Sequence, residues 1–142
     1  MTSAEERLAA AVGEAMYARD TASQALGMTI EEVGPGYARV RMAVRADMLN
    51  GHGTCHGGLV FALADSAFAF ACNSHDVVTV AAGCSIEFLA PARLGDRLTA
   101  ECGEQASVGR TGIYDARVTN QDGELIAVFR GRSATVRGTW VA

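Results

Sequence analysis

The sequence predicts one α+β domain, covering residues 1–142, in which an antiparallel sheet curls around a single long helix. Two observations support this prediction. Residues 59–72 are almost wholly apolar over a helical length, and a helix that is apolar on all sides is normally buried. After it, segments of alternating apolar and polar residues are joined by connections too short for a parallel crossover, which favours antiparallel pairing.

The N-terminal segment predicts an amphipathic helix that ends near residue 19. Ser3 and Glu6 stand in the positions of a capping box. Leu8, Val12 and Met16 then recur at every fourth residue, with charged residues between them. We expect this helix to cover one side of the core.

Two strands are expected before the apolar helix. From Gly27 onward, apolar residues alternate with polar ones. A turn at residues 34–36 separates this run from a second alternating run over residues 38–44. The basic residues of the second run form either a solvated face or a contact with another subunit.

Strand patterns return after the helix. Alternation predicts further strands near residues 84–88, 98–102, 114–118 and 124–136. Pro91 ends the first of these. Cys84 and Cys102 fall among the apolar positions, so we expect both thiols in the core. The tail after residue 137 has no pattern that predicts a role.

Charge and composition exclude several classes of function. A net charge of −4 gives no general attraction to nucleic acid or to anionic membranes. Residues 1–6 lack the features of a signal peptide, and the longest apolar run is too short to span a bilayer. Four widely spaced cysteines favour free thiols in a reducing compartment. We therefore expect a cytoplasmic protein with no nucleic-acid or membrane partner.

A glycine-rich loop over residues 50–58 leads into the apolar helix, and Asp65 lies in the middle of that helix. Burying an ionised carboxylate is costly unless it is paired, so Asp65 is either a catalytic acid or a buried cap. At Gly57, free N–H groups at the helix start suit an oxyanion, although glycine here could simply permit a tight entry. The spacing of His52, Cys55 and His56 matches no zinc pattern, so we expect no metal site.

The spacing of Gly57 and Asp65 has a geometric consequence. Asp65 follows Gly57 by eight residues, which on an α-helix is a rise of about 12 Å. One substrate carbonyl cannot contact both groups of the same helix. If both act in one site, one of them comes from a neighbouring subunit whose helix runs antiparallel across a two-fold axis. A catalytic motif therefore predicts a dimer.

Three further polar residues are candidates near this motif. His56 and Asn50 are placed to position the loop, a water or a carbonyl. Ser66 can bond to the neighbouring carboxylate or to the preceding helical turn. Each of the three also has a purely structural interpretation.

The run from Asn50 to Gly58, with Asp65 at its spacing, resembles the hotdog thioesterases of the phenylacetate pathway. The resemblance continues through residues 85–91, 109–115, 122–124 and 129–131, and so covers nearly all of the chain after residue 25. It implies a hotdog fold, with an antiparallel sheet of five to six strands around one long central helix. It also implies homodimers with active sites at the dimer interface, which pair into homotetramers.

The resemblance further implies hydrolysis of aryl-acyl-CoA thioesters, such as phenylacetyl-CoA and its hydroxylated relatives. Asp65 would act as nucleophile or as general base, and the Gly57 amide would polarise the thioester carbonyl. His56 and Asn50 would assist at the carbonyl or the water, and Ser66 would support the carboxylate. No separate cofactor is implied, because coenzyme A is part of the substrate.

The phosphates of coenzyme A are anionic while the chain is net acidic, so local side chains should hold them. Candidates for this role are Arg110, Thr111, Arg130 and Arg132. The alternatives are a hotdog thioesterase for another acyl group (hydroxybenzoyl or medium-chain), a dehydratase on acyl carriers, or a non-catalytic acyl-CoA-binding module. The binding module is disfavoured because an apolar binding helix gains nothing from a central acid.

Overall fold

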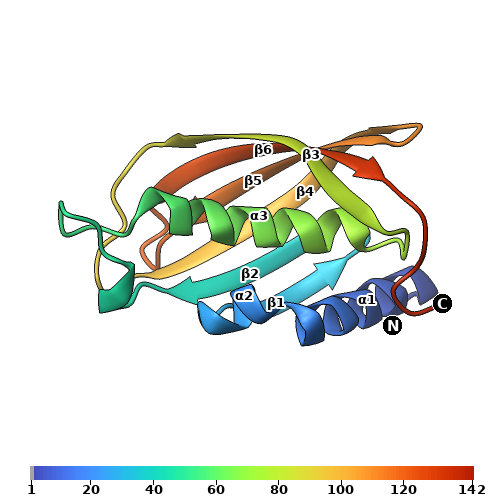
Figure 1. Ribbon diagram of the computed structural model, residues 1–142, viewed down its shortest axis with the longest axis horizontal. Coiled ribbons are helices and arrows are strands. Elements are labelled where there is room, and N and C mark those ends of the chain that lie inside the picture. Colours follow the sequence, from blue (N-terminus) through green and yellow to red (C-terminus); the bar gives the residue numbers. More distant parts are fainter. Residues whose placement is uncertain (1) are drawn as a thin grey trace.

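The computed structural model describes residues 2–142 and confirms the predicted α+β architecture. One antiparallel sheet curls around helix α3 (Gly57–Asn73), which lies across its concave face (Figure 1). The strand order is β1-β2-β4-β5-β6-β3. The strands are β1 (Thr29–Gly34), β2 (Tyr37–Ala43), β3 (Thr79–Phe88), β4 (Arg97–Val108), β5 (Thr111–Thr119) and β6 (Leu125–Thr135).

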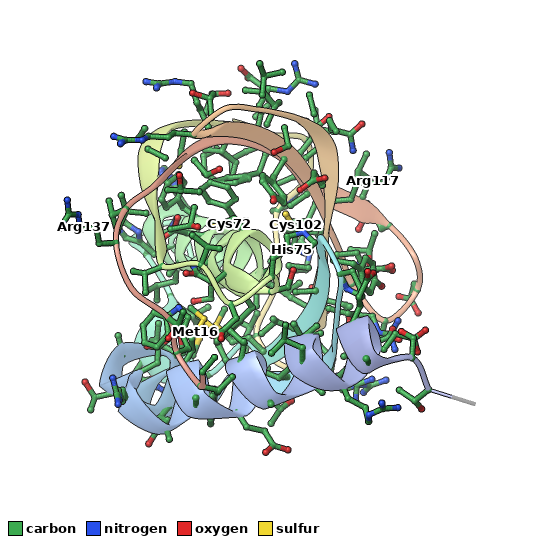
Figure 2. All side chains as sticks on the ribbon, turned by 90° about the vertical axis from the view of Figure 1, so that its right-hand side faces the viewer. Met16, Cys72, His75, Cys102, Arg117 and Arg137 are labelled. Atoms are coloured by element: carbon green, nitrogen blue, oxygen red, sulfur yellow. The ribbon has the colours of Figure 1, made fainter. Side chains whose placement is uncertain are left out.

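Helix α3 is the centre of the hydrophobic core. Viewed nearly end-on, it is enclosed by the curved sheet on one side and by helix α1 (Ala4–Arg19) on the other (Figure 2). The Phe68 ring packs against Tyr114 and Phe129, with centroids 5.6 and 5.7 Å away. At Gly131 of β6, a Cβ atom would lie only 2.7 Å from the Phe68 ring. Helix and sheet therefore meet too closely for a side chain at this position.

The N-terminal helix ends where it was expected to end, and Ser3 caps it. The Ser3 hydroxyl accepts a hydrogen bond from the Glu6 N–H at 3.1 Å. A second helix, α2 (Thr21–Ala25), follows directly and was not predicted. It is too short to show a hydrophobic period, and Asp20 caps it by accepting from the Ser23 N–H at 2.9 Å. A short 3₁₀ turn, η1 (Ala46–Met48), was also not predicted.

The C-terminal tail has a structural role that its sequence did not predict. The buried Asp76 carboxylate accepts hydrogen bonds from the N–H groups of Trp140, Val141 and Ala142, at 2.7 to 3.1 Å. The Trp140 indole also donates to Asn73 Oδ1 at 2.9 Å. These contacts hold the tail against the C-terminal end of α3, on the right-hand side of Figure 1.

Strand β3 is an edge strand with β6 as its one neighbour. Cys102 is buried as expected, but Cys84 is exposed, so its predicted core position is wrong for the single chain. The reason is that the edge strand is left uncovered over most of its length. Val80 and Phe88 are large apolar residues of β3 that are about half exposed. Within residues 2–142, no helix is both long and apolar enough to cross a membrane.

Candidate active site

The loop before α3 leaves one backbone donor free at the helix start. His56 is the N-cap, and its Nδ1 accepts a hydrogen bond from the Gly58 N–H at 2.9 Å. Because Nδ1 is the acceptor, the neutral ring carries its proton on Nε2. Among residues 2–142, the Gly57 N–H has no hydrogen-bond partner. The helix therefore presents the Gly57 N–H at its positive end, where an oxyanion binds well.

Asn50 holds the loop in shape and lines a cavity beside Gly57. Its Oδ1 accepts from the N–H groups of His52 and Thr54, at 2.9 and 3.2 Å. Among residues 2–142, the amide nitrogen of Asn50 has no hydrogen-bond partner, so it is available as a donor. Asn50, Gly57 and Phe88 line the same cavity, which has a volume of about 360 Å³. The Phe88 ring covers Gly57 closely, since a Cβ there would lie 3.1 Å from Phe88 Cζ.

Asp65 is half-buried and unpaired. Within the described residues, its carboxylate takes part in no hydrogen bond and no ion pair. No contact therefore supports the alternative in which Asp65 caps backbone N–H groups. Burial raises the pKa of Asp65, and the negative charge of Asp20 raises it further. The structure thus contains an acid with increased proton affinity and no structural partner.

Ser66 contacts a residue of α2. Its Oγ lies 2.9 Å from Ser23 Oγ, and Ser23 Oγ lies 2.6 Å from Asp20 Oδ2. No hydrogen bond joins Ser66 to Asp65 within residues 2–142. The sequence reasoning missed Asp20 and Ser23. The spacing of an aspartate and a serine three residues later does suit a helix cap, but nothing in it shows contact with Ser66.

The structure brings together only part of the predicted site in one chain. Asn50, His56 and Gly57 lie at the N-terminal end of α3, whereas Asp65 is the ninth residue of the same continuous helix. At the α-helical rise, Gly57 and Asp65 are about 12 Å apart along the axis. The two groups therefore face different places in one subunit.

The four residues expected to hold coenzyme A fall into two groups. Arg130 pairs with Asp115 through two bonds of 2.6 and 2.8 Å, and this arginine keeps the pKa of Asp115 below its usual range. Arg132 donates to the Ala82 carbonyl at 3.2 Å. Because the intervening Gly131 faces Phe68, both arginines lie on the outer face of the sheet.

Arg110 and Thr111 form the other group. They lie at the hairpin between β4 and β5 and line a cavity of about 190 Å³, together with Cys72 of α3 and His75, which follows the end of that helix. In the end-on view, Cys72 lies within the curve of the sheet, while Arg117 points outward from the sheet (Figure 2).

Comparison with known proteins identifies relatives of this chain. A family model described as the thioesterase superfamily matches residues 52–127, a segment that contains Gly57 and Asp65. The acyl-coenzyme A thioesterase PaaI of Escherichia coli strain K12 is 47% identical over 125 residues, which cover 88% of this chain and 89% of that protein.

Solved structures are similar over most of the chain. The E. coli PaaI protein from the phenylacetic acid degradation operon has a TM-score of 0.93 at 45% identity, covering 94% of this chain and 97% of that chain. A mutant of the phenylacetic acid degradation protein PaaI from Thermus thermophilus has a TM-score of 0.79 at 39% identity, covering 82% and 100%. A Streptococcus mutans protein bound to acetyl CoA has a TM-score of 0.76 at 25% identity, covering 79% and 90%.

Proposed function

We propose a function for this chain from the premise that it belongs to the thioesterase superfamily, of which it has the hotdog fold. It is an acyl-CoA thioesterase of the PaaI type, related to proteins of phenylacetate degradation. We infer that its substrates are aryl-acyl-CoA thioesters, such as phenylacetyl-CoA and its hydroxylated relatives. The main support for this function is that one helix has both an unpartnered Asp65 and a free Gly57 N–H among residues 2–142.

In the proposed mechanism, the Gly57 N–H binds the thioester carbonyl oxygen and stabilises its negative charge as it develops. Removal of one such donor typically costs about 10²–10³-fold in kcat. Asp65 either takes a proton from the attacking water or attacks the carbonyl carbon itself. The C–S bond then breaks, and the sulfur of coenzyme A takes a proton and leaves as the thiol. The raised pKa of Asp65 suits a base, because proton affinity increases with pKa.

We propose that each site is shared between two subunits of a homodimer. The helix rise of about 12 Å argues for this, since about two helical turns separate Gly57 from Asp65. Support comes from edge strand β3, whose uncovered backbone and half-exposed Val80 and Phe88 suit pairing with a second copy. Pairing at this edge would bring Cys84 into an interface.

We also propose that dimers pair into tetramers. Edge pairing would leave the outer face of the sheet free. That face has a hollow of about 420 Å³ that includes Ser85, Asp115 and Arg130, and it is our candidate surface for the second dimer.

For coenzyme A, the proposal keeps His56 and Asn50 near the carbonyl and favours Arg110 and Thr111 for the phosphates. These last two residues line a cavity, whereas Arg130 is already neutralised by Asp115 and Arg132 bonds to a backbone carbonyl. A cytoplasmic location is part of the proposal and is supported by four cysteines without a disulfide.

The experiment that tests the proposed function measures thiol release from a panel of acyl-CoA thioesters. The panel contains phenylacetyl-CoA, a hydroxyphenylacetyl-CoA, a hydroxybenzoyl-CoA and a medium-chain acyl-CoA. We expect the highest kcat/KM on the phenylacetyl group and loss of turnover in Asp65→Asn. Faster turnover of another acyl group would reassign the substrate. Binding without release of thiol would contradict the hydrolase.

A further inference from the structure

A hydrogen-bonded chain links the junction of α1 and α2 to the residue beside Asp65. It runs from the Asp20 carboxylate through Ser23 Oγ, at 2.6 Å, to Ser66 Oγ, at 2.9 Å. Ser23 is 2% exposed, so water does not compete for its hydroxyl. Asp20 is also fixed by the bond that it accepts from the Ser23 N–H at 2.9 Å.

Which group donates in each of these hydrogen bonds follows from the number of protons available. An ionised carboxylate only accepts, so the single hydroxyl proton of Ser23 points to Asp20. Ser23 Oγ then acts as the acceptor for Ser66, and the Ser66 proton points to Ser23. In every other direction, Ser66 Oγ presents lone pairs. Ser66 is half-buried and directly follows Asp65 in α3, and Asp20, at the other end of these hydrogen bonds, is close enough to Asp65 for its charge to raise the pKa of that acid.

We propose that Asp20 and Ser23 are positioning residues, which hold Ser66 as an acceptor that orients the attacking water next to Asp65. This inference rests on the proposed function. The water donates one hydrogen to Ser66 Oγ and the other to the Asp65 carboxylate, which leaves its own lone pair for the carbonyl carbon. Asp65 takes the proton as the C–O bond forms, and the leaving sulfur receives it as the C–S bond breaks. If Asp65 attacks first, the C–S bond breaks as the acyl-aspartyl anhydride forms. The same water, held by Ser66 Oγ, then hydrolyses the anhydride, and its proton goes to the departing thiolate.

The charge of Asp20 provides a second link, separate from the hydrogen bonds, between the α1–α2 junction and Asp65. The groups that interact electrostatically with Asp65 are Asp20 from the α1–α2 junction, Cys72 from α3 itself and Cys84 from β3. Asp20 is the carboxylate of this set, and its negative charge raises the pKa of Asp65. The same side chain therefore orients Ser66 and increases the basicity of Asp65.

Two variants separate the orienting effect from the effect of charge. Asp20→Asn keeps a good cap for α2, because asparagine and aspartate cap helices equally well. However, the asparagine places an N–H₂ donor against Ser23 Oγ. The Ser23 hydroxyl proton then points to Ser66 instead of to residue 20, and the negative charge is lost. Ser23→Ala breaks the chain but keeps the charge. Ser3→Ala is the matched control, since it removes the cap of α1 without touching the chain.

The experiment measures kcat and KM for phenylacetyl-CoA across pH in these variants, in Ser66→Ala and in the double variant Ser23→Ala/Ser66→Ala, which keeps the charge of Asp20. We expect Asp20→Asn and Ser23→Ala each to lower kcat about tenfold, a loss typical of groups coupled through direct contacts, with little change in KM. Only Asp20→Asn should move the acid limb of the profile to lower pH. The double variant should be no slower than Ser66→Ala alone, and Ser3→Ala should match the wild type.

Wild-type kcat and an unmoved acid limb in Asp20→Asn, with wild-type kcat in Ser23→Ala, would overturn the proposal. So would additive losses in the double variant, because independent sites give additive effects. The Asp65→Asn variant distinguishes a failure of this positioning proposal from a failure of the proposed function. If Asp65→Asn retains turnover, the mechanism itself is wrong. If Asp65→Asn is inactive while Asp20→Asn and Ser23→Ala match the wild type, only the positioning role of Asp20 and Ser23 is wrong.

Discussion

At the scale of single residues, the site combines groups that lower stability with groups that enable chemistry. Asp65 is a half-buried acid without a partner among residues 2–142, on a helix that is otherwise apolar. A residue of this kind is retained at a cost in stability, as is common where a site needs a perturbed acid. The free Gly57 N–H is a second unsatisfied group of the same helix.

The first prediction concerns the stability of Asp65→Asn. Because the pKa of Asp65 is raised in the folded state, its stabilising contribution is complete below the ordinary pKa of about 3.9. That contribution is lost as the pH rises through the folded-state pKa. Asp65→Asn should therefore have a higher unfolding temperature than the wild type at pH 7, with a smaller difference near pH 3. Calorimetry at the two pH values checks this, and an equal or lower unfolding temperature at pH 7 would contradict it.

The second prediction isolates the Gly57 N–H. Gly57→Pro removes this donor at the first position of a helix, where proline is well tolerated, and His56 already has the extended backbone (φ −57°, ψ 130°) that precedes a proline. Gly57→Ala adds the same Cβ against Phe88 but keeps the donor. Proline should lower kcat by about 10²–10³-fold, and alanine far less. Equal losses in the two variants would show that crowding, not the donor, matters.

Residue-level expectations succeeded where the interaction is local and failed where it is not. The cap by Ser3 involves residues three apart, and its motif is visible in the sequence. The contact between Ser23 and Ser66 joins residues 43 apart, and no local pattern encodes it. Cys84 was expected in the core because alternation identifies one face of a strand, not whether another element covers that face.

At the scale of elements, a glycine of β6 allows α3 to pack closely against the sheet. Gly131 lets the Phe68 ring approach the backbone of β6. Gly103 of β4 provides a contrast, since a Cβ there would meet nothing within 4 Å.

The third prediction follows from this contrast. Gly131→Ala should lower the free energy of unfolding by about 1–3 kcal/mol, because it overpacks the core. Gly103→Ala should change it by less than about 0.5 kcal/mol, as surface changes usually do. Denaturant titration of both variants measures the difference. Equal stabilities would mean that the α3–β6 contact is not tight in solution.

The fourth prediction concerns the C-terminal tail. Asp76 accepts three backbone N–H groups of the tail and has a positive φ of 65°. Asp76→Gly suits that φ but loses the bonds, and should cost about 1.5–3 kcal/mol, the range for hydrogen bonds to a charged group. Asp76→Asn keeps an acceptor and should cost less. If Asp76→Gly is as stable as the wild type in thermal unfolding, the tail contributes nothing.

Long alternating or apolar runs made most of the elements predictable, including α1, α3 and the strands on either side of α3. Helix α2 has five residues, too few for a period to appear. The docking of the tail depends on Asp76, which lies 64 residues before Trp140 in the sequence. Side-chain contacts over such separations arise only once the sheet has closed around α3.

At the scale of the whole molecule, a complete site of the proposed kind requires a second copy of the chain. In one subunit, Gly57 stands at the start of α3 and Asp65 about two turns further along it, so the two groups do not meet at one point. Edge strand β3 leaves a surface with large apolar side chains exposed. A dimer that pairs these edges would place two antiparallel α3 helices together, and it would complete two sites at once.

The fifth prediction tests this shared site by mixing two inactive subunits, Asp65→Asn and Gly57→Pro. In a hybrid dimer, one site would combine two damaged groups, and the other would combine an intact Asp65 with the partner's intact Gly57. About half of randomly paired dimers are hybrids with one working site in two, so the mixture should recover about a quarter of wild-type turnover of phenylacetyl-CoA. Turnover no higher than the sum of the two separate variants, in a mixture shown to contain hybrids, would place both groups in one subunit and contradict the account.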